Sequence, residues 1–309
     1  MRSRFNLLII AAASLLLLSC ASATSSKPVE LNNPYIVSAE NHTGNGMASM
    51  QKERWDAAIH SFSRALTAAQ LADEPTLITG SWYNLAAAQS RAGLTAKAEN
   101  AYTQAIALSH RHGDQTMQLR STLALRLMQQ RQSRLPEGFS LQQLPASLFS
   151  KQQWPADLHL QAARLAHRLG ERSMANAAYQ LVTRSKIKSR NGLKIKAEAH
   201  MGLALLARDS GESQSAIRES EQTLSYCRQI GAPRLTAHAL LLQAELVQQS
   251  GEKQDKLERA VAIYSAMGDA AGQKKALQLL LRESESAGLK ELSEQLRLRL
   301  SDLEDKLGE

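Results

Sequence analysis

The sequence predicts an all-α protein built from repeated helical hairpins. Its 309 residues include only 16 glycines and 7 prolines, and aromatic residues make up 4% of the chain. Alanine, leucine, glutamine, arginine and glutamate are abundant instead, and these residues favour helices. The glycines at 170, 211 and 251 lie 41 and 40 residues apart. Regular spacing of this length is typical of stacked structural repeats, and no run of alternating β-branched residues suggests a sheet.

The first twenty residues have the pattern of an export signal. Arg2 and Arg4 form a short basic segment, and residues 5–18 are almost wholly apolar. A membrane-spanning helix needs roughly 20 apolar residues, so this run is too short to be one. Its length and flanks are typical of a secretory signal, and it ends in Leu-Leu-Ser followed by Cys20.

That ending resembles the lipobox of bacterial lipoprotein precursors. The resemblance implies cleavage after Ser19, a diacylglyceryl group on the Cys20 thiol and acylation of the new amine. Two or three acyl chains suffice for stable anchoring. Ala21 follows the cysteine, which resembles the outer-membrane sorting choice of enterobacterial lipoproteins, so we expect the periplasmic face of the outer membrane. An ordinary signal peptide cleaved after Ala23 is the alternative.

The chain is expected to divide into five parts. Residues 1–19 form the signal peptide, and residues 20–35 form a lipidated, flexible tether whose small, polar and proline residues cannot offset chain entropy by burial. Helical repeats follow over 36–132. An irregular insertion is predicted at 133–154, and a second set of repeats with a capping helix at 155–309.

The clearest repeat runs from Trp82 to Gly93, and small or aromatic residues follow it at Ala98, Tyr102 and Ala105. This pattern resembles the tetratricopeptide repeat (TPR), a helical hairpin with small residues where its helices cross and a glycine at its turn. The usual period of that repeat is about 34 residues. The period of about 40 in this chain implies longer helices or longer connections.

Further copies are recognisable along most of the chain. The matching positions are Gly46, Trp55, Ala58, Phe62 and Ala65; Ala163, Gly170, Ala175, Tyr179 and Val182; Ala204, Gly211, Ala216 and Ser220; Ala244, Gly251 and Lys256; and Ala287 and Gly288. Ser220 replaces the aromatic residue, and Lys256 replaces the small one. Residues 115–132 predict a helix, but Pro136, Gly138 and Pro145 interrupt the next copy. The charged final segment, 290–307, is expected to be a solvating cap.

The resemblance implies a concave surface lined by the first helix of each repeat. Residues placed there by the turn glycines form an apolar strip flanked by arginines, and that surface suits an acidic or carboxyl-terminal segment of a partner. Solvated surface arginines are the alternative interpretation. The predicted groove residues are Tyr83, Arg91, Leu160, Arg164, His167, Arg168, Met201 and Arg208.

No residue pattern indicates catalysis, a cofactor or a metal site. His110 and His112 lie near a predicted helix end, where basic side chains meet the helix dipole. Cys227 is expected to be a buried thiol. The net charge of +8 is spread along the chain, which argues against nucleic-acid binding.

We therefore expect a lipid-anchored scaffold that binds a protein or peptide and serves envelope assembly or secretion. The membrane would be contacted through the N-terminal lipid, and no small-molecule substrate is evident. A structural subunit of an envelope complex is one alternative. An enzyme with a divergent site is a second.

Overall fold

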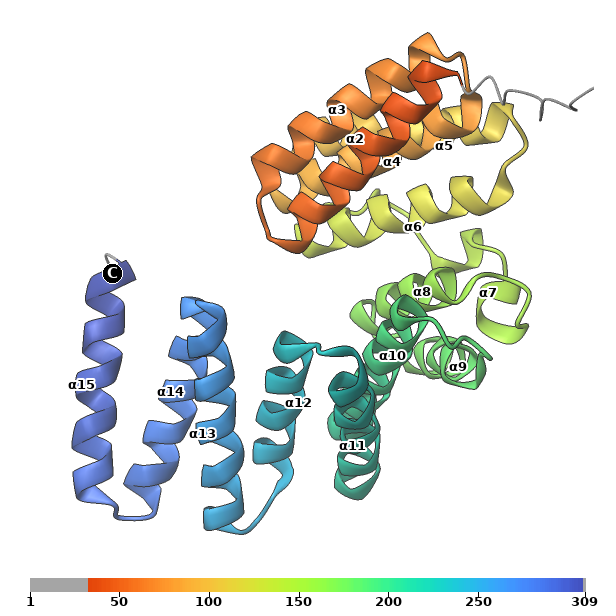
Figure 1. Cartoon of the computed structure of the whole chain (residues 1–309). Coiled ribbons are helices and arrows are strands. Elements are labelled where there is room, and N and C mark those ends of the chain that lie inside the picture. The colour runs from red at the N-terminus through yellow and green to blue at the C-terminus, as the bar shows by residue number, and fades with distance from the viewer. Residues whose placement is uncertain (1–32, 308–309) are drawn as a thin grey trace, which may run out of the picture.

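A computed structural model describes residues 33–307, which form 14 α-helices and one short 3-10 helix, with no strand in that range (Figure 1). No helix in this range is long and apolar enough to cross a bilayer. The helices are α2 (Pro34–Gln51), α3 (Trp55–Leu71), α4 (Pro75–Arg91), α5 (Thr95–Arg111), α6 (Gln115–Arg131), η1 (Leu141–Gln143), α7 (Ser147–Ser150), α8 (Ala156–Arg168), α9 (Arg172–Arg184), α10 (Arg190–Asp209), α11 (Ser213–Ile230), α12 (Pro233–Leu246), α13 (Ser250–Met267), α14 (Ala270–Ser286) and α15 (Lys290–Leu307).

The signal peptide, Cys20 and nearly all of the predicted tether lie outside the described residues. The first described helix begins at Pro34, two residues inside the predicted tether. Asn33 caps it, because its side-chain oxygen accepts a hydrogen bond from the amide of Tyr35 at 3.0 Å. The last helix covers the predicted capping segment.

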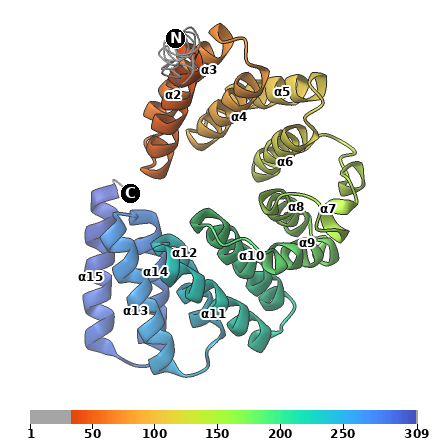
Figure 2. The same ribbon diagram turned by 45° about the vertical axis from the view of Figure 1, so that its right-hand side comes forward.

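The helices pack as antiparallel hairpins that stack side by side. The first helices of the hairpins are α2, α4, α6, α8, α10, α12 and α14, and the second helices are α3, α5, α9, α11, α13 and α15. After α6, an irregular segment with η1 and the short α7 takes the place of a second helix. The array curls so that the first helices line the inside of a ring and the second helices lie outside (Figure 2). This is the all-α repeat fold that the sequence predicts.

In several hairpins, the turn between the two helices contains a residue with left-handed backbone conformation. Gly93 has φ of +77°, a conformation that costs glycine little. The amide of Leu94, just beyond it, donates to the carbonyl of Gln89 at 2.9 Å and so satisfies an acceptor at the end of α4. The predicted turn glycines at 170, 211 and 288 share this left-handed φ, so they are confirmed.

Small residues in one helix accommodate aromatic rings from another. A Cβ added to Gly46 would lie 2.5 Å from the Phe62 ring, and one added to Gly202 would lie 2.2 Å from Tyr179. Contacts this short explain why these helix-interior positions are glycine despite its low helix propensity. Ala98 is fully buried and Tyr102 is 4% exposed, as the repeat pattern predicts.

Ala98 and the nearby Ala96 provide a matched test of the repeat register, since Ala96 is exposed in the first turn of the same helix. We expect Ala98→Leu to lower the free energy of unfolding by about 1–3 kcal/mol, because the close contact cannot take three more carbons. Ala96→Leu should change it by less than about 0.5 kcal/mol. Denaturant titration measures both, and equal values would contradict the register.

The predicted turn at Gly251 is wrong. Gly251 lies in the first turn of α13, and extended Val247 and Gln249 flank the connection from α12. The helix register is therefore set by Ala260 and Tyr264, which are both buried and have the four-residue spacing of Ala98 and Tyr102. Lys256 is consequently not the counterpart of the small residue.

The insertion predicted at 133–154 replaces the second helix of the third hairpin. It contains only η1 and α7, and its Leu141, Leu148 and Phe149 join the largest core cluster. His159 on α8 is 1% exposed, and its ring Nδ1 lies 2.7 Å from the carbonyl oxygen of Leu148. This hydrogen bond ties the irregular segment to the regular array.

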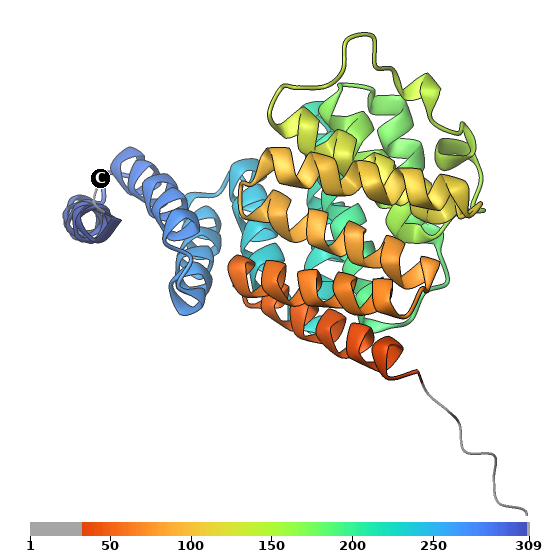
Figure 3. The same cartoon turned by 90° about the horizontal axis from the view of Figure 1, so that it is seen from above.

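One ionic contact joins the two ends of the ring. Arg234, in the first turn of α12, pairs with Glu53 in the turn between α2 and α3, and its Nε lies 3.2 Å from Asp269. Seen from above, α14 and α15 extend beyond the rest of the array (Figure 3). The described residues of the first and sixth hairpins therefore meet, while the last hairpin reaches past this contact.

Removing the Arg234 guanidinium should open the ring without unfolding it. Both partners are more than 40% exposed, and exposed ion pairs contribute about 0–1 kcal/mol. In Arg234→Ala, the distance between spin labels at the exposed positions Met47 and Leu298 should lengthen and spread, with an unchanged melting temperature. Arg259→Ala, which removes a pair within α13, is the control. An unaltered distance distribution in Arg234→Ala would disprove the closing role.

Candidate protein-binding surface

The candidate surface is the inner face formed by the first helices. On α4, Tyr83, Ala87 and Ser90 are half-buried and Arg91 is exposed, whereas Leu85 and its neighbours are buried. Positions spaced by three and four residues lie on one face of a helix. The predicted stripe of this repeat is therefore open to solvent on the inside of the ring.

Leu160 does not belong to this surface, contrary to the prediction. It is 3% exposed and lies within the largest core cluster. Helix α8 contacts α6 and α10 as well as its hairpin partner α9, so these neighbouring hairpins cover faces of α8 that would be exposed in an isolated hairpin. Met201 is half-buried and packs against the core of the following hairpins, so it offers only part of its side chain.

Two of the predicted groove arginines are paired within the protein. Arg164 Nη2 lies 3.0 Å from Glu198, and Arg208 lies 3.2 Å from Glu245 and 2.8 Å from Asp209. These contacts join α8 to α10 and α10 to α12. The charges of Arg164 and Arg208 therefore mainly hold neighbouring hairpins together.

The predicted His167 is also engaged. Its Nε2 lies 3.5 Å from Asp209, and its ring meets Tyr179 edge-on with centroids 6.3 Å apart. Arg208 and His167 lower the pKa of Asp209 against the opposing effect of burial. His167 therefore links the first helices α8 and α10.

Tyr83 lies beside a second polar contact. Arg120 on α6 and Asp157 on α8 form an ion pair at 2.8 Å. Burial is the main cause of the raised pKa of the Tyr83 phenol, so this hydroxyl stays protonated. The sequence missed Arg120, because its partner is 37 residues away and no local pattern connects them.

Three arginines on the inner side have no such partner. Within residues 33–307, no carboxylate forms an ion pair with Arg91, Arg131 or Arg168. Arg168 Nη1 donates a hydrogen bond to the amide oxygen of Gln130 at 3.2 Å. Burial lowers the pKa of Arg131, and the nearby charges of Arg168, Arg91 and Arg164 lower it further. Arg131 was not predicted, because the helix that carries it lacks the repeat's turn glycine.

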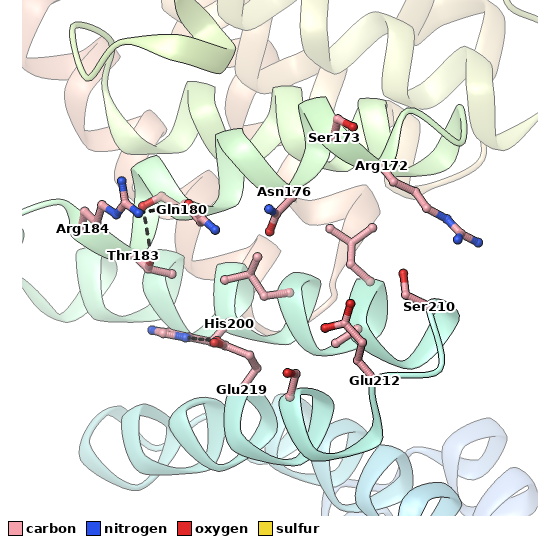
Figure 4. A pocket seen from close by; sticks show the side chains of 14 residues that line it. Arg172, Ser173, Asn176, Gln180, Thr183, Arg184, His200, Ser210, Glu212 and Glu219 are labelled. Atoms are coloured by element: carbon pink, nitrogen blue, oxygen red, sulfur yellow. Dashed lines mark hydrogen bonds and ion pairs between the residues drawn. The ribbon is translucent and has the colours of Figure 1, made fainter.

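A separate polar cleft of about 540 Å³ lies between the second helices α9 and α11 (Figure 4). Polar side chains such as Asn176 and Gln180 form one side, and Glu212 and Glu219 form the other. His200 Nδ1 lies 2.7 Å from Glu219. The cleft is open, and side chains of the first helix α10, among them His200 and Leu203, line it between the two second helices. None of the predicted groove residues lines it.

Other candidate reactive groups are inert or isolated. The Cys227 thiol is 2% exposed, so it is buried as predicted. Burial raises its pKa, which makes the thiol poorly reactive. His110 lies in the last turn of α5 and His112 just beyond it, both at the helix end as expected. No group of three or more potential metal ligands occurs in the part of the chain that the structure describes.

Comparisons with known proteins agree with this architecture. No family model matches the sequence, and no curated protein matches it. The structure resembles the apo form of the quorum sensor NprR from B. thuringiensis, with a TM-score of 0.59 and 15% identity over 86% of this chain and 76% of that one. A tetratricopeptide repeat protein from Parabacteroides merdae also matches, with a TM-score of 0.38 and 16% identity over 85% and 98% of the two chains. At these identities only the fold is comparable, and the likeness to NprR supports the tetratricopeptide-like fold of stacked helical hairpins.

Proposed function

We propose that this protein is a lipid-anchored scaffold of the bacterial envelope that binds protein partners on the inner face of its helical ring. The observation that carries this proposal is a set of half-buried and exposed side chains on successive first helices, which line the inside of the ring. They are Tyr83 and Arg91 on α4, His167 and Arg168 on α8, and Met201 and Arg208 on α10. A curved surface of this kind offers one extended area to a partner segment. The location follows from the lipobox resemblance ending at Cys20.

The function is therefore binding rather than chemistry. Several polar side chains of the inner face form ion pairs that join helices, as in Arg120–Asp157 and Arg164–Glu198. A catalytic site needs a nucleophile or a general base that reaches a reacting atom. On the inner face, the imidazole of His167 is paired with Asp209, and the carboxylates of Asp157 and Glu198 are paired with arginines. Service in envelope assembly or secretion is the finer part of the proposal.

Site-specific photo-crosslinking tests the location of binding. A photoreactive residue at Ser90, on the inner face, should crosslink a defined set of envelope proteins in intact cells. The same residue at Arg259, which is exposed on the second helix α13, is the control. Equal products at both positions, or none at Ser90, would refute binding at the inner face.

A further inference from the structure

Three consecutive first helices of the array each end in an arginine. Arg91, Arg131 and Arg168 are the last residues of α4, α6 and α8, and we call them the arginine row. Each lies two residues before a residue with left-handed φ, at 93, 133 and 170. They therefore occupy one repeat position in three neighbouring hairpins. The left-handed turn residue is glycine after Arg91 and Arg168 but Ser133 after Arg131, and the position of the arginine relative to the turn is the same in all three.

The row ends at an acidic residue. The residue two positions before Gly211 is Asp209, which pairs with Arg208 and with His167. The other nearby carboxylates, Asp157 and Glu198, are also paired with arginines outside the row. Within the described part of the chain, these carboxylates are engaged elsewhere and none forms an ion pair with a member of the row, so the row keeps its positive charge.

Helix-end stabilisation explains each arginine singly but not their convergence. A cation near a helix C-terminus gains roughly 0.3–1 kcal/mol from the helix dipole. Arg111 and Arg184 at the ends of the second helices α5 and α9 have this same advantage. The row differs because the charges of Arg91 and Arg168 both act on Arg131, whose helix α6 contacts both α4 and α8. Like charges brought together in this way repel one another, and an anion bound among them removes that cost.

We infer that the arginine row binds an acidic segment of the partner protein, in extended conformation, with carboxylates at about every third residue. This inference rests on the proposed scaffold function. The spacing follows from α4 contacting α6 and α6 contacting α8. Packed helices lie about 8–10 Å apart, and an extended chain advances about 3.3 Å per residue. One step between helices therefore equals about three residues, and the fork of each guanidinium matches one carboxylate.

The test uses the purified full-length protein and a fluorescent nine-residue peptide with glutamate at positions 1, 4 and 7 among glycine and serine. The same peptide with glutamine at these positions is the ligand control. Replacing the row by Arg91→Ser, Arg131→Ser and Arg168→Ser should weaken binding of the glutamate peptide by about tenfold or more, since close charge pairs dominate such contacts. It should also reduce the salt dependence of binding.

A matched variant separates the effect of the arginines' position on peptide binding from the effect of the protein's net charge. Arg111→Ser, Arg184→Ser and Arg228→Ser removes three exposed arginines near the ends of second helices. It has the same net charge as the row variant and should bind the peptide within about twofold of wild type, because distant exposed charges are screened. Thermal melting should be equal or higher in the row variant than in the matched variant. A lower melting temperature would show that the row serves the helix ends instead.

Three results of the binding measurements would also overturn the inference. These are equal weakening by both triple variants, equal affinity for the glutamate and glutamine peptides, and a row-dependent affinity for phosphatidylglycerol vesicles, measured on the Cys20→Ala protein, that exceeds peptide affinity. The crosslinking at Ser90 distinguishes this failure from failure of the scaffold function. Unchanged crosslinks in the row variant would refute the row and leave the scaffold standing, whereas absence of crosslinks in wild type refutes the scaffold itself.

Discussion

Replacing His159 with alanine is expected to lower the free energy of unfolding by about 2–4 kcal/mol. The imidazole is 1% exposed, and its Nδ1–H donates to the Leu148 carbonyl at 2.7 Å. Alanine leaves a cavity between α8 and the irregular segment that contains η1 and α7. It also leaves a buried carbonyl without its donor. Both effects act on the same contact, so the loss exceeds that of an ordinary surface substitution.

The measurement is chemical denaturation of the His159→Ala protein, followed by circular dichroism. His60→Ala, which removes an exposed imidazole from α3, is the matched control and should change stability by less than about 0.5 kcal/mol. Limited proteolysis should then cut the variant first within residues 133–154, because the irregular segment has lost its attachment. Equal stability of the two variants would contradict the proposed role of His159.

Cys20→Ala is expected to move the protein from the membrane fraction to the soluble fraction almost completely. The apolar segment ending at Cys20 is the basis of this prediction. Anchoring would then depend on two or three acyl chains, whose removal leaves little affinity for lipid.

Fractionation of cells that express the wild-type and Cys20→Ala proteins measures this effect, and mass spectrometry of the wild-type N-terminal peptide should identify the acyl groups on Cys20. Ser22→Ala, two residues away, is the control and should stay in the membrane fraction. A soluble wild-type protein that begins after Ala23 and carries no lipid would contradict the prediction.

The repeat fold could be predicted because its signals are local. Within one hairpin, the distance from Gly93 to Ala98 and Tyr102 is set by the turn and by the helix period, so the sequence spacing alone determines which side chains are buried. The same reasoning located the interruption at 133–154, since Pro136 and Pro145 are incompatible with a continuous helix. The sequence by itself also determined the all-α class and the inner stripe of α4.

Only the tertiary structure decided which inner residues are available. Leu160 is covered by neighbouring helices, Arg164 and Arg208 are paired with Glu198 and Glu245, and Arg131 is placed beside arginines of two other hairpins. Each of these contacts joins residues about 35 or more positions apart. Their geometry depends on how hairpins stack and how tightly the array curls, and these properties arise from the packing of all the hairpins together rather than from the spacing within one.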